Sequence, residues 1–354
     1  MELTREAPDG WDSRTSLPIL TEGFAEASRT VGHRPRFVED PRDRALVLLR
    51  GVPLPIAWRW TLQAKVYVER GHPGFLQALL SRLRRLGVAR VRVNDERHGL
   101  PDTTLWSWPH VRPVRRYAFL IDAAGRTDGE LLKAMEDPVP RNIRKAERAR
   151  VVVDEIRSEK DLREFTALVE ETSDRIRARR VASVYPAEFF AAAFRSMVPR
   201  GQALFLLARA DGEPLAGQMY LVSKQRLTYY HGGSTRSREL TPKHGSTAAF
   251  WYALRLARDR GIGIFDFGGA SPTTDRADAQ FSLSDFKRRW GGRLVLVPSA
   301  DVVLSPTRAA FQDRCLKPFW DRVHPLYLRI CRTDEGKAAD ALQRRHSSDP
   351  ARST

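Results

Sequence analysis

Cysteine and long apolar runs are what this chain of 354 residues has least of. Its two cysteines, Cys315 and Cys331, lie near the C-terminus and outside any CxxC pattern, so we expect no disulfide framework and no zinc site. No apolar stretch approaches the ~20 residues that span a bilayer. The first ten residues are acidic and polar, which does not fit a secretory signal. The sequence thus predicts a reduced, soluble, cytoplasmic protein.

Motifs for several common chemistries are also missing. The sequence has no nucleophile elbow, no Walker loop and no HExxH pattern, and it shows no cluster of metal ligands. His231 precedes two glycines and a serine, a pattern that favours a strand end and a turn over a catalytic histidine. No heptad run indicates a coiled-coil arm. We therefore expect neither a metal ion nor a bound cofactor.

Positive charge is abundant. Lysine and arginine number 60 against 43 aspartates and glutamates, which gives a formal net charge of +17. Such an excess favours a polyanionic partner, which could be nucleic acid, a phosphorylated substrate or an anionic membrane. The alternative is a general basic bias of the source proteome, because the charge is spread along the chain.

The chain is long enough for two domains, and its pattern of elements repeats. In each half, hydrophobic periodicity predicts a hairpin, then an amphipathic helix, then a glycine and a strand. This order predicts two copies of one mixed α/β domain that meet near residue 145. The predicted helices cover 74–86 and 246–260, the glycines are Gly87 and Gly261, and the strands cover 88–93 and 262–267.

Two sites match the loop pattern with which acyltransferases bind the pyrophosphate of acyl-CoA, [RQ]-x-x-G-x-[GA]. They are RRLGVA at 84–89 and RDRGIG at 258–263. Both follow a predicted helix and precede a strand, whereas the phosphate loop needs the order strand then helix. We therefore interpret both as helix C-caps.

Residues 231–292 combine several short motifs in a fixed order. A small-residue turn ending in Ser234 precedes an amphipathic helix and a strand that closes on aromatic-Asp-x-Gly-Gly. A polar loop then leads to Phe-Lys, an aromatic residue and glycine. The ordered set resembles the C-terminal domain of the FemABX transferases. The residues that carry the resemblance are Phe265, Asp266, Phe267, Gly268, Gly269, Phe286, Lys287, Trp290 and Gly291.

Two upstream segments agree with this resemblance. Residues 131–155 resemble the basic segment that leads into the family's second domain. Residues 165–190 resemble its F-x-x-L-x-x-x-T-x-x-R helix, with Thr172 and Arg175 at the last two positions. The resemblance implies an α/β (α+β) fold of two tandem GNAT-like (acyl-CoA N-acyltransferase-like) domains without a coiled-coil arm. We predict domains at 1–145, completed by a C-terminal helix over 305–335, and at 146–304, with a disordered tail over 336–354.

The family resemblance also implies an activity and its partners. Such enzymes move an amino acid from aminoacyl-tRNA to an amine of a UDP-linked or lipid-linked muropeptide precursor, forming an amide in peptidoglycan synthesis. A lipid-linked acceptor would add transient contact with a membrane surface. The aminoacyl ester is already activated. Amide formation therefore needs a positioned amine and a stabilised oxyanion, but no metal or covalent intermediate.

By the same resemblance, Lys287 would stabilise the tetrahedral intermediate, and Phe286 would pack its helix or line the channel. The alternative for Lys287 is a solvated lysine in a basic helix. Arg175 takes the position of a phosphate-binding arginine. Arg29 falls closest to a second phosphate ligand in the first domain, although a surface arginine would also explain it.

A carboxylate that ends a first-domain strand has been suggested as a base in the family, and here Asn94 or Asp95 takes that place. If it is Asn94, proton transfer through the tRNA ribose hydroxyl fits better than direct base catalysis. Basic side chains would hold the tRNA by charge, or would merely form a solvated face. The candidates are Arg141, Arg144, Lys145, Arg148, Arg288, Arg289 and Arg293.

Two other functions stay open at this stage. The first is a BioF2-like, acyl-CoA-dependent GNAT N-acyltransferase, supported by the shared fold and opposed by the missing pyrophosphate loop. The second is a non-catalytic nucleic-acid-binding protein, supported by charge alone, since no known binding module occurs in the sequence.

Overall fold

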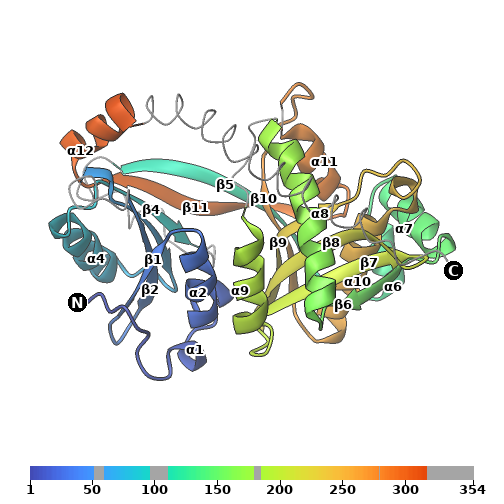
Figure 1. The fold of residues 1–354 in the computed structure, drawn as a ribbon, viewed down its shortest axis with the longest axis horizontal. Helices are drawn as coiled ribbons and strands as arrows, with labels where there is room; N and C mark the ends of the chain where they lie inside the picture. Colours follow the sequence, from blue (N-terminus) through green and yellow to red (C-terminus); the bar gives the residue numbers. More distant parts are fainter. Residues whose placement is uncertain (52–59, 96–110, 179–184, 279, 317–354) are drawn as a thin grey trace, which may run out of the picture.

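A computed structural model describes residues 1–51, 60–95, 111–178, 185–278 and 280–316 (Figure 1). In this part of the chain, eleven strands form one mixed sheet in the order β1-β2-β3-β4-β11-β5-β10-β9-β8-β7-β6. The first half contributes β1 (Arg34–Glu39), β2 (Arg44–Arg50), β3 (Gln63–Val68), β4 (Arg90–Asp95) and β5 (Val111–Asp122). The second half contributes β6 (Val152–Glu155), β7 (Ala203–Ala210), β8 (Glu213–Val222), β9 (Arg226–Ser234), β10 (Ile264–Ala270) and β11 (Arg293–Val303).

The strand order confirms the repeat expected from the sequence. Strands β1-β2-β3-β4 and β7-β8-β9-β10 are equivalent series that run inward from opposite sides of the sheet, with β6 as an additional edge strand beside β7. In each series three antiparallel strands are followed by a crossover helix and a parallel fourth strand. The two halves then exchange their last strands, because β11 pairs with β4 and β5 pairs with β10. The crossover helices are α4 (Pro73–Arg85) and α10 (Gly245–Asp259).

Helices cover both faces of the sheet, so successive side chains of a strand are buried in core clusters on opposite faces. Leu46 and Leu48 of β2 pack in the core beneath α2, α8 and α9, whereas Val47 and Leu49 pack against α4. Helix α2 lies beside α9, so the two halves also meet through their helices (Figure 1). These helices are α2 (Glu22–Thr30), α8 (Glu159–Ala178) and α9 (Ala187–Met197).

Helix α10 and the segment between the halves cover the second half's other face. A third core cluster joins α10 to Phe265 and Phe267 of β10 and to Ile143 of the basic segment. The basic segment is thus an amphipathic helix whose apolar side is buried. The remaining helices are α1 (Trp11–Arg14), α6 (Asp128–Ala134), α7 (Val139–Arg148), α11 (Phe281–Arg288) and α12 (Pro306–Phe311).

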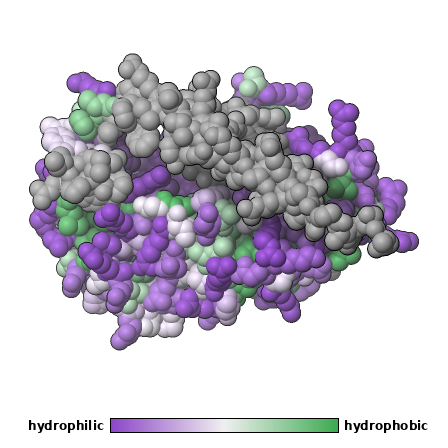
Figure 2. All heavy atoms as spheres, in the orientation of Figure 1, coloured by the Kyte–Doolittle hydropathy of each residue, from purple (hydrophilic) through white to green (hydrophobic). Residues whose placement is uncertain are grey.

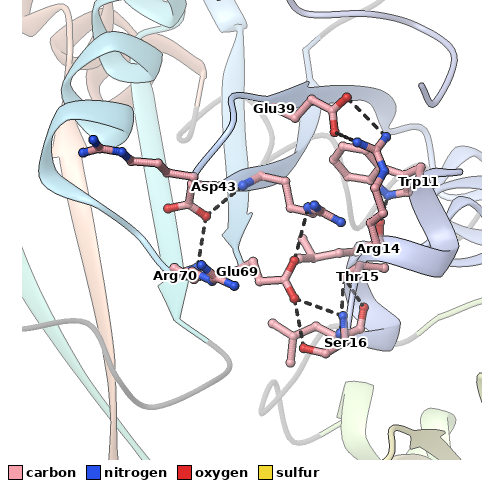
Figure 3. A network of polar contacts seen from close by, with 12 residues as sticks. Trp11, Arg14, Thr15, Ser16, Glu39, Asp43, Glu69 and Arg70 are labelled. Carbon is pink, nitrogen blue, oxygen red and sulfur yellow. Dashed lines mark hydrogen bonds and ion pairs between the residues drawn. The ribbon is translucent and has the colours of Figure 1, made fainter. Parts of the chain in front are cut away.

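A buried carboxylate fixes the N-terminal segment to the first half's sheet (Figure 3). Glu69 follows β3 and accepts hydrogen bonds from the backbone N–H and the hydroxyl of Ser16, at 3.0 and 2.9 Å. Its other oxygen lies 3.4 Å from Nε of Arg44, whose guanidinium also stacks over the Trp11 ring. The segment before α2 is thereby part of the first half's core.

Most predicted elements occur within a few residues of their expected bounds, and the differences are informative. Strand β1 was not expected, because its arginines and proline mask the apolar alternation. Strand β5 begins six residues earlier than the strand predicted over 117–122. Helix α12 and the π-helix Gln312–Leu316 that follows it pack on the first half, where Gln312 hydrogen-bonds Gln63. The rest of the helix predicted over 305–335 lies outside the described residues, as do the tail and Cys331.

The domain bounds stay a prediction, since one sheet runs through both halves. No helix within the described ranges is long and apolar enough to cross a membrane. Hydrophilic side chains dominate the face of the molecule seen in Figure 2, in keeping with the charge of the chain.

Candidate functional site

The two parallel strand pairs of the sheet differ in one respect. Strands β3 and β4 pair over six positions, from Gln63 opposite Arg90 to the last residues of both strands. Strands β9 and β10 pair over three positions only, and the last is Thr228 opposite Asp266. Beyond this point, β9 and β10 continue without pairing to each other. Strands β9 and β10 therefore part after this point, and their backbone groups there are not paired with each other; this place is the opening between the two parallel strands.

A β-bulge shapes β9 at this opening. Met219 of β8 faces His231 and Tyr220 faces Tyr229, so Tyr230 is an extra residue without a partner across the strand pair. The bulge brings Tyr230 and His231 toward the same aromatic group before α9. The Tyr230 hydroxyl donates a hydrogen bond to the Tyr185 hydroxyl at 2.8 Å, and the His231 ring lies 6.0 Å from the Tyr185 ring.

His231 is neutral at physiological pH in this setting. Burial lowers the pKa of its imidazole from 6.5 to about 4. Its Nδ1 atom has no hydrogen-bond partner among the described residues. The sequence analysis interprets His231 as a strand end followed by a turn. It does not predict the bulge, because a bulge depends on the pairing of β9 with β8.

Strand β10 is kinked on the other side of the opening. Gly268 has a φ of 68°, and a Cβ atom there would lie 2.7 Å from the carbonyl oxygen of Tyr229. The carboxylate of Asp266 accepts a hydrogen bond from the Gly268 N–H at 2.7 Å. Pairing with β5 shifts its register between Asp266 and Gly269. The Asp-x-Gly-Gly motif thus builds the kink, and pairing with β5 resumes at Gly269, opposite Ala118.

Lys287 of α11 reaches this kink. Its side chain is only 4% exposed, and its Nζ donates a hydrogen bond to the Gly269 carbonyl oxygen at 2.5 Å. Burial lowers the pKa of Lys287 from 10.5 to about 8, an effect that the carboxylate of Asp266 opposes. Asp266 also lies 3.5 Å from the guanidinium of Arg226. The buried ammonium therefore stays protonated at neutral pH. The alternative expected for Lys287, a solvated lysine in a basic helix, is therefore wrong.

Two of the other predicted substrate residues, Arg29 and Asn94, belong to elements of the first half. Arg29 forms an exposed ion pair with Glu26 within α2. Asn94 is buried in β4 and accepts a hydrogen bond from Arg116 at 3.1 Å. The side chains of Asp95, at the end of β4, and of Arg175, in α8, lie outside the described residues.

Phe286 packs in the core, with its ring 5.7 Å from Phe250 and 6.1 Å from Trp290. Of the two roles expected for it, packing of the helix is the one that its ring contacts show. Trp290 is itself 1% exposed, so the aromatic of the Phe-Lys-x-x-aromatic motif anchors α11 on α10.

The arginines of α11 are already engaged by acidic partners. Arg288 pairs with Glu136 at 2.5 Å and with Asp285 at 2.9 Å. Arg289 pairs with Asp285 at 2.7 Å and donates to the Asp137 carbonyl. These contacts attach α11 to the loop before α7, so the charges of Arg288 and Arg289 are partly neutralised. Arg293 lies 3.6 Å from Asp122.

Helix α7 keeps more of its charge available. Arg144, Lys145 and Arg148 are exposed and form no ion pair with any residue that the structure describes, while Arg141 pairs with Asp137 at 3.4 Å. The helix borders a surface hollow of about 600 Å³, lined by Arg141, Arg144, Glu147 and Arg148. The charges of Arg144, Lys145 and Arg148 are thus not neutralised by acidic side chains of the described residues. Among the described residues, no group of three acidic, histidine or cysteine side chains could hold a metal ion.

Comparison with known proteins agrees with this architecture. Residues 138–288 match the family model described as "Acetyltransferase (GNAT) domain". No curated protein matches the chain. Among solved structures, FemX is 15% identical and superimposes with a TM-score of 0.68, covering 89% of this chain and 100% of its own.

Two further structures are similar over most of their length. The C-terminal domain of a putative lysylphosphatidylglycerol synthetase from Agrobacterium fabrum is 14% identical, with a TM-score of 0.51 and coverage of 82% of this chain and 90% of its own. A conserved protein of unknown function from Bacteroides thetaiotaomicron is 8% identical, with a TM-score of 0.56 and coverage of 85% and 99%. Residues 138–288 therefore match a GNAT acetyltransferase domain, and the chain shares the GNAT-like fold of FemX over almost its whole length.

Proposed function

We propose that this protein is an aminoacyltransferase that uses aminoacyl-tRNA to acylate an amine of a peptidoglycan precursor or a related peptide. The observation that carries the proposal is the protonated Lys287, buried beside the opening between β9 and β10. The FemX-like fold and the GNAT domain support the coarser class of acyl-transferring enzyme. Dependence on tRNA rests on the resemblance of the sequence to the FemABX family.

The chemistry of ester aminolysis suits this arrangement. Attack of the amine on the ester carbonyl forms the new C–N bond and places negative charge on the carbonyl oxygen. An ammonium has three N–H donors, and the Gly269 carbonyl uses one of those on Lys287. The remaining donors can stabilise the oxyanion until the C–O bond to the tRNA ribose breaks. Asp266 helps Lys287 stay protonated during this step.

The leaving ribose hydroxyl takes up a proton, and the attacking amine loses one. Within the described residues, His231 is a neutral group beside the opening with an unpartnered nitrogen that could relay this proton. Substrate-assisted transfer through the ribose hydroxyl would serve equally if Asn94, and not Asp95 at the end of β4, takes the place of the family's carboxylate.

The alternative, an acyl-CoA-dependent N-acyltransferase, is favoured by the match to the GNAT family model. The two sequence matches to a pyrophosphate loop do not support it. Gly87 and Gly261 have φ values of 85° and 68° and end α4 and α10. Val88 N–H donates to the Leu83 carbonyl, as in a Schellman C-cap. Both matches are therefore helix ends, as the sequence predicted.

The decisive experiment supplies the full-length protein with muropeptide precursors and either a pool of tRNAs charged with labelled amino acids or labelled acetyl-CoA. We expect label to move from tRNA to the precursor and to be abolished by RNase. Transfer from acetyl-CoA alone would replace this proposal with the acyl-CoA alternative. Lys287→Met is the matched variant, because a methionine fills similar volume without the charge; it should bind tRNA as before but lose transfer.

A further inference from the structure

Three large apolar side chains are exposed at one end of the molecule. Trp60 is 45% exposed and Phe311 of α12 is 37% exposed, and the centroids of their rings lie 5.3 Å apart. Leu86, which follows α4, is 43% exposed. Figure 1 places α4 and α12 at the same end of the long axis of the molecule. Single exposed apolar residues are common on protein surfaces, whereas a cluster of them marks an interaction site.

An arginine joins the leucine to the aromatic pair. Arg308 of α12 lies against Gly87, since a Cβ atom on Gly87 would be 2.7 Å from Nη1 of this arginine. Leu86 is the residue before Gly87, and Phe311 is one helical turn after Arg308. Arg308 is therefore next to both. We call Trp60, Leu86 and Phe311 the apolar patch.

Positive charge surrounds the apolar patch. Four arginines lie beside its members, in α4, in α12 and in the π-helix that follows α12, and they form no ion pair within the described ranges. Asp313, the acidic residue beside them in that π-helix, is engaged by Arg90 of β4. The patch and its surroundings therefore have a net positive charge among the described residues. The four are Arg84, Arg85, Arg308 and Arg314.

We propose that this end of the first half, with the apolar patch and its four arginines, docks on an anionic lipid bilayer. Exposed aromatic and leucine side chains bind at the boundary between headgroups and acyl chains. Guanidinium groups bind the lipid phosphates, and their long side chains can reach them beside buried apolar groups. Each basic residue close to an anionic surface strengthens binding by about fivefold. The exposed side chains thus match both the acyl chains and the phosphates of such a surface.

A single-stranded nucleic acid would also contact aromatic and basic side chains, but the geometry of the patch fits it less well. Successive bases of a strand stack on aromatic rings. The rings of Trp60 and Phe311 are inclined to each other by 59°, so parallel bases could not stack on both. Leu86 offers contact to an acyl chain but no ring for stacking. The patch therefore suits lipid chains better than bases.

Docking would bring the protein to a lipid-linked acceptor, a role that rests on the proposed function. Docking itself does not depend on that function. Vesicle binding is measured without tRNA, without an acceptor and without turnover, so the two proposals can fail separately.

The test is co-sedimentation of the full-length protein with vesicles of phosphatidylglycerol and phosphatidylcholine in equal amounts. The charge variant is Arg84→Gln combined with Arg85→Gln. Its matched control is Arg144→Gln combined with Lys145→Gln, which removes the same charge from α7, a helix without an exposed large apolar side chain. We expect the charge variant to bind at least about tenfold more weakly, and the control to lose less than about threefold.

The apolar variant, Trp60→Ser combined with Phe311→Ser, keeps every charge and should also bind about tenfold more weakly, because it removes both rings. Lipids with brominated acyl chains should quench the tryptophan fluorescence of the unaltered protein and should quench that of Trp60→Phe less. This second readout needs no loss of binding. Thermal melting of each variant establishes that it is folded.

Equal losses in the charge variant and its control would show attraction to net charge only and would overturn the proposal. So would an apolar variant that binds vesicles as tightly as the unaltered protein, since the rings would then not reach the lipid. A single-stranded oligonucleotide is titrated in parallel. If the charge and apolar variants lose binding to it but keep their binding to vesicles, the patch is a nucleic-acid site and not a membrane site.

Discussion

The Nζ atom of Lys287 lies 2.5 Å from the carbonyl oxygen of Gly269, in the segment where β10 departs from regular pairing. A carbonyl partner holds an ammonium in place without neutralising it, unlike a direct carboxylate contact. The lysine is thus oriented toward the opening and remains a cation near neutral pH. The role proposed for Lys287 requires a protonated ammonium, so the pH dependence of transfer is the most direct probe of the site.

The first prediction concerns the pH dependence of transfer. Because the pKa of Lys287 is lowered to about 8, raising the pH through 8 removes the ammonium and should lower the rate of transfer, by about tenfold per unit at the limit. Lys287→Met should be slower by about 10²–10³ at pH 7 and should lack this decline. Single-turnover transfer from purified charged tRNA, corrected for spontaneous ester hydrolysis, measures both. An alkaline decline that persists in Lys287→Met would assign it to another group.

The second prediction concerns the kink of β10. Gly268→Ala places a methyl group 2.7 Å from the rigid Tyr229 carbonyl at a residue with positive φ, and we expect a loss of about 1–3 kcal/mol in the free energy of unfolding. Gly269→Ala is the control, since its Cβ meets nothing within 4 Å, and should change stability by less than about 0.5 kcal/mol. Urea unfolding compares them. Equal stabilities would contradict the idea that Gly268 is required by the kink.

The third prediction concerns stability in mild acid. The pKa values of His33 and His231 fall from 6.5 to about 4 on folding. Between these limits the unfolded chain binds protons that the folded chain does not, so stability should fall as pH drops from 6.5 toward 4, by up to about 3 kcal/mol for each histidine. Well above pH 6.5 both histidines are neutral in the folded and the unfolded chain, so neither contributes to the pH dependence of stability.

Melting temperatures at pH 7.5 and pH 5 measure this loss. The double variant His33→Asn and His231→Asn should show a smaller difference between the two pH values than the unaltered protein. His72→Asn, at an exposed histidine, should leave the difference unchanged. If the double variant is as acid-sensitive as the unaltered protein, the two imidazoles are not the cause.

The sequence predicts the fold better than the site. Helices such as α4 and α10 have apolar residues at helical spacing and glycine C-caps, which are local properties, and the repeated order of elements follows from them. The exchange of β5 and β11 between the halves has no local pattern, because pairing partners far apart in sequence decide it. The bulge at Tyr230 cannot be predicted from local sequence for the same reason, because it depends on the pairing of β8 with β9.

Family resemblance identified Lys287, but it did not indicate that the residue is buried against Gly269. The resemblance also identified Asn94, but it did not indicate that this side chain is buried and accepts a hydrogen bond from Arg116. That contact crosses β11, so it depends on the register of three strands, and no single strand contains that information.

The last prediction tests the carboxylate that joins the N-terminal segment to β3 (Figure 3). Glu69 is 6% exposed, so Glu69→Ala leaves the partly buried Arg44 guanidinium without this ion pair and the Ser16 N–H without this acceptor, and we expect a loss of about 3 kcal/mol. Glu69→Gln keeps an acceptor for Ser16 and should lose less. Glu26→Ala, which breaks an exposed pair with Arg29, should lose under about 0.5 kcal/mol.

Chemical unfolding followed by tryptophan fluorescence gives these differences, because Trp11 is buried beside Arg44 and reports on the same contact. The order Glu69→Ala, then Glu69→Gln, then Glu26→Ala follows from how much of each charge or donor is left in a buried place without a partner. A Glu69→Ala variant as stable as Glu26→Ala would mean that apolar packing of Trp11 and Leu20 alone holds the segment. In that case, replacing Trp11 should be the damaging change and Glu69 would be dispensable.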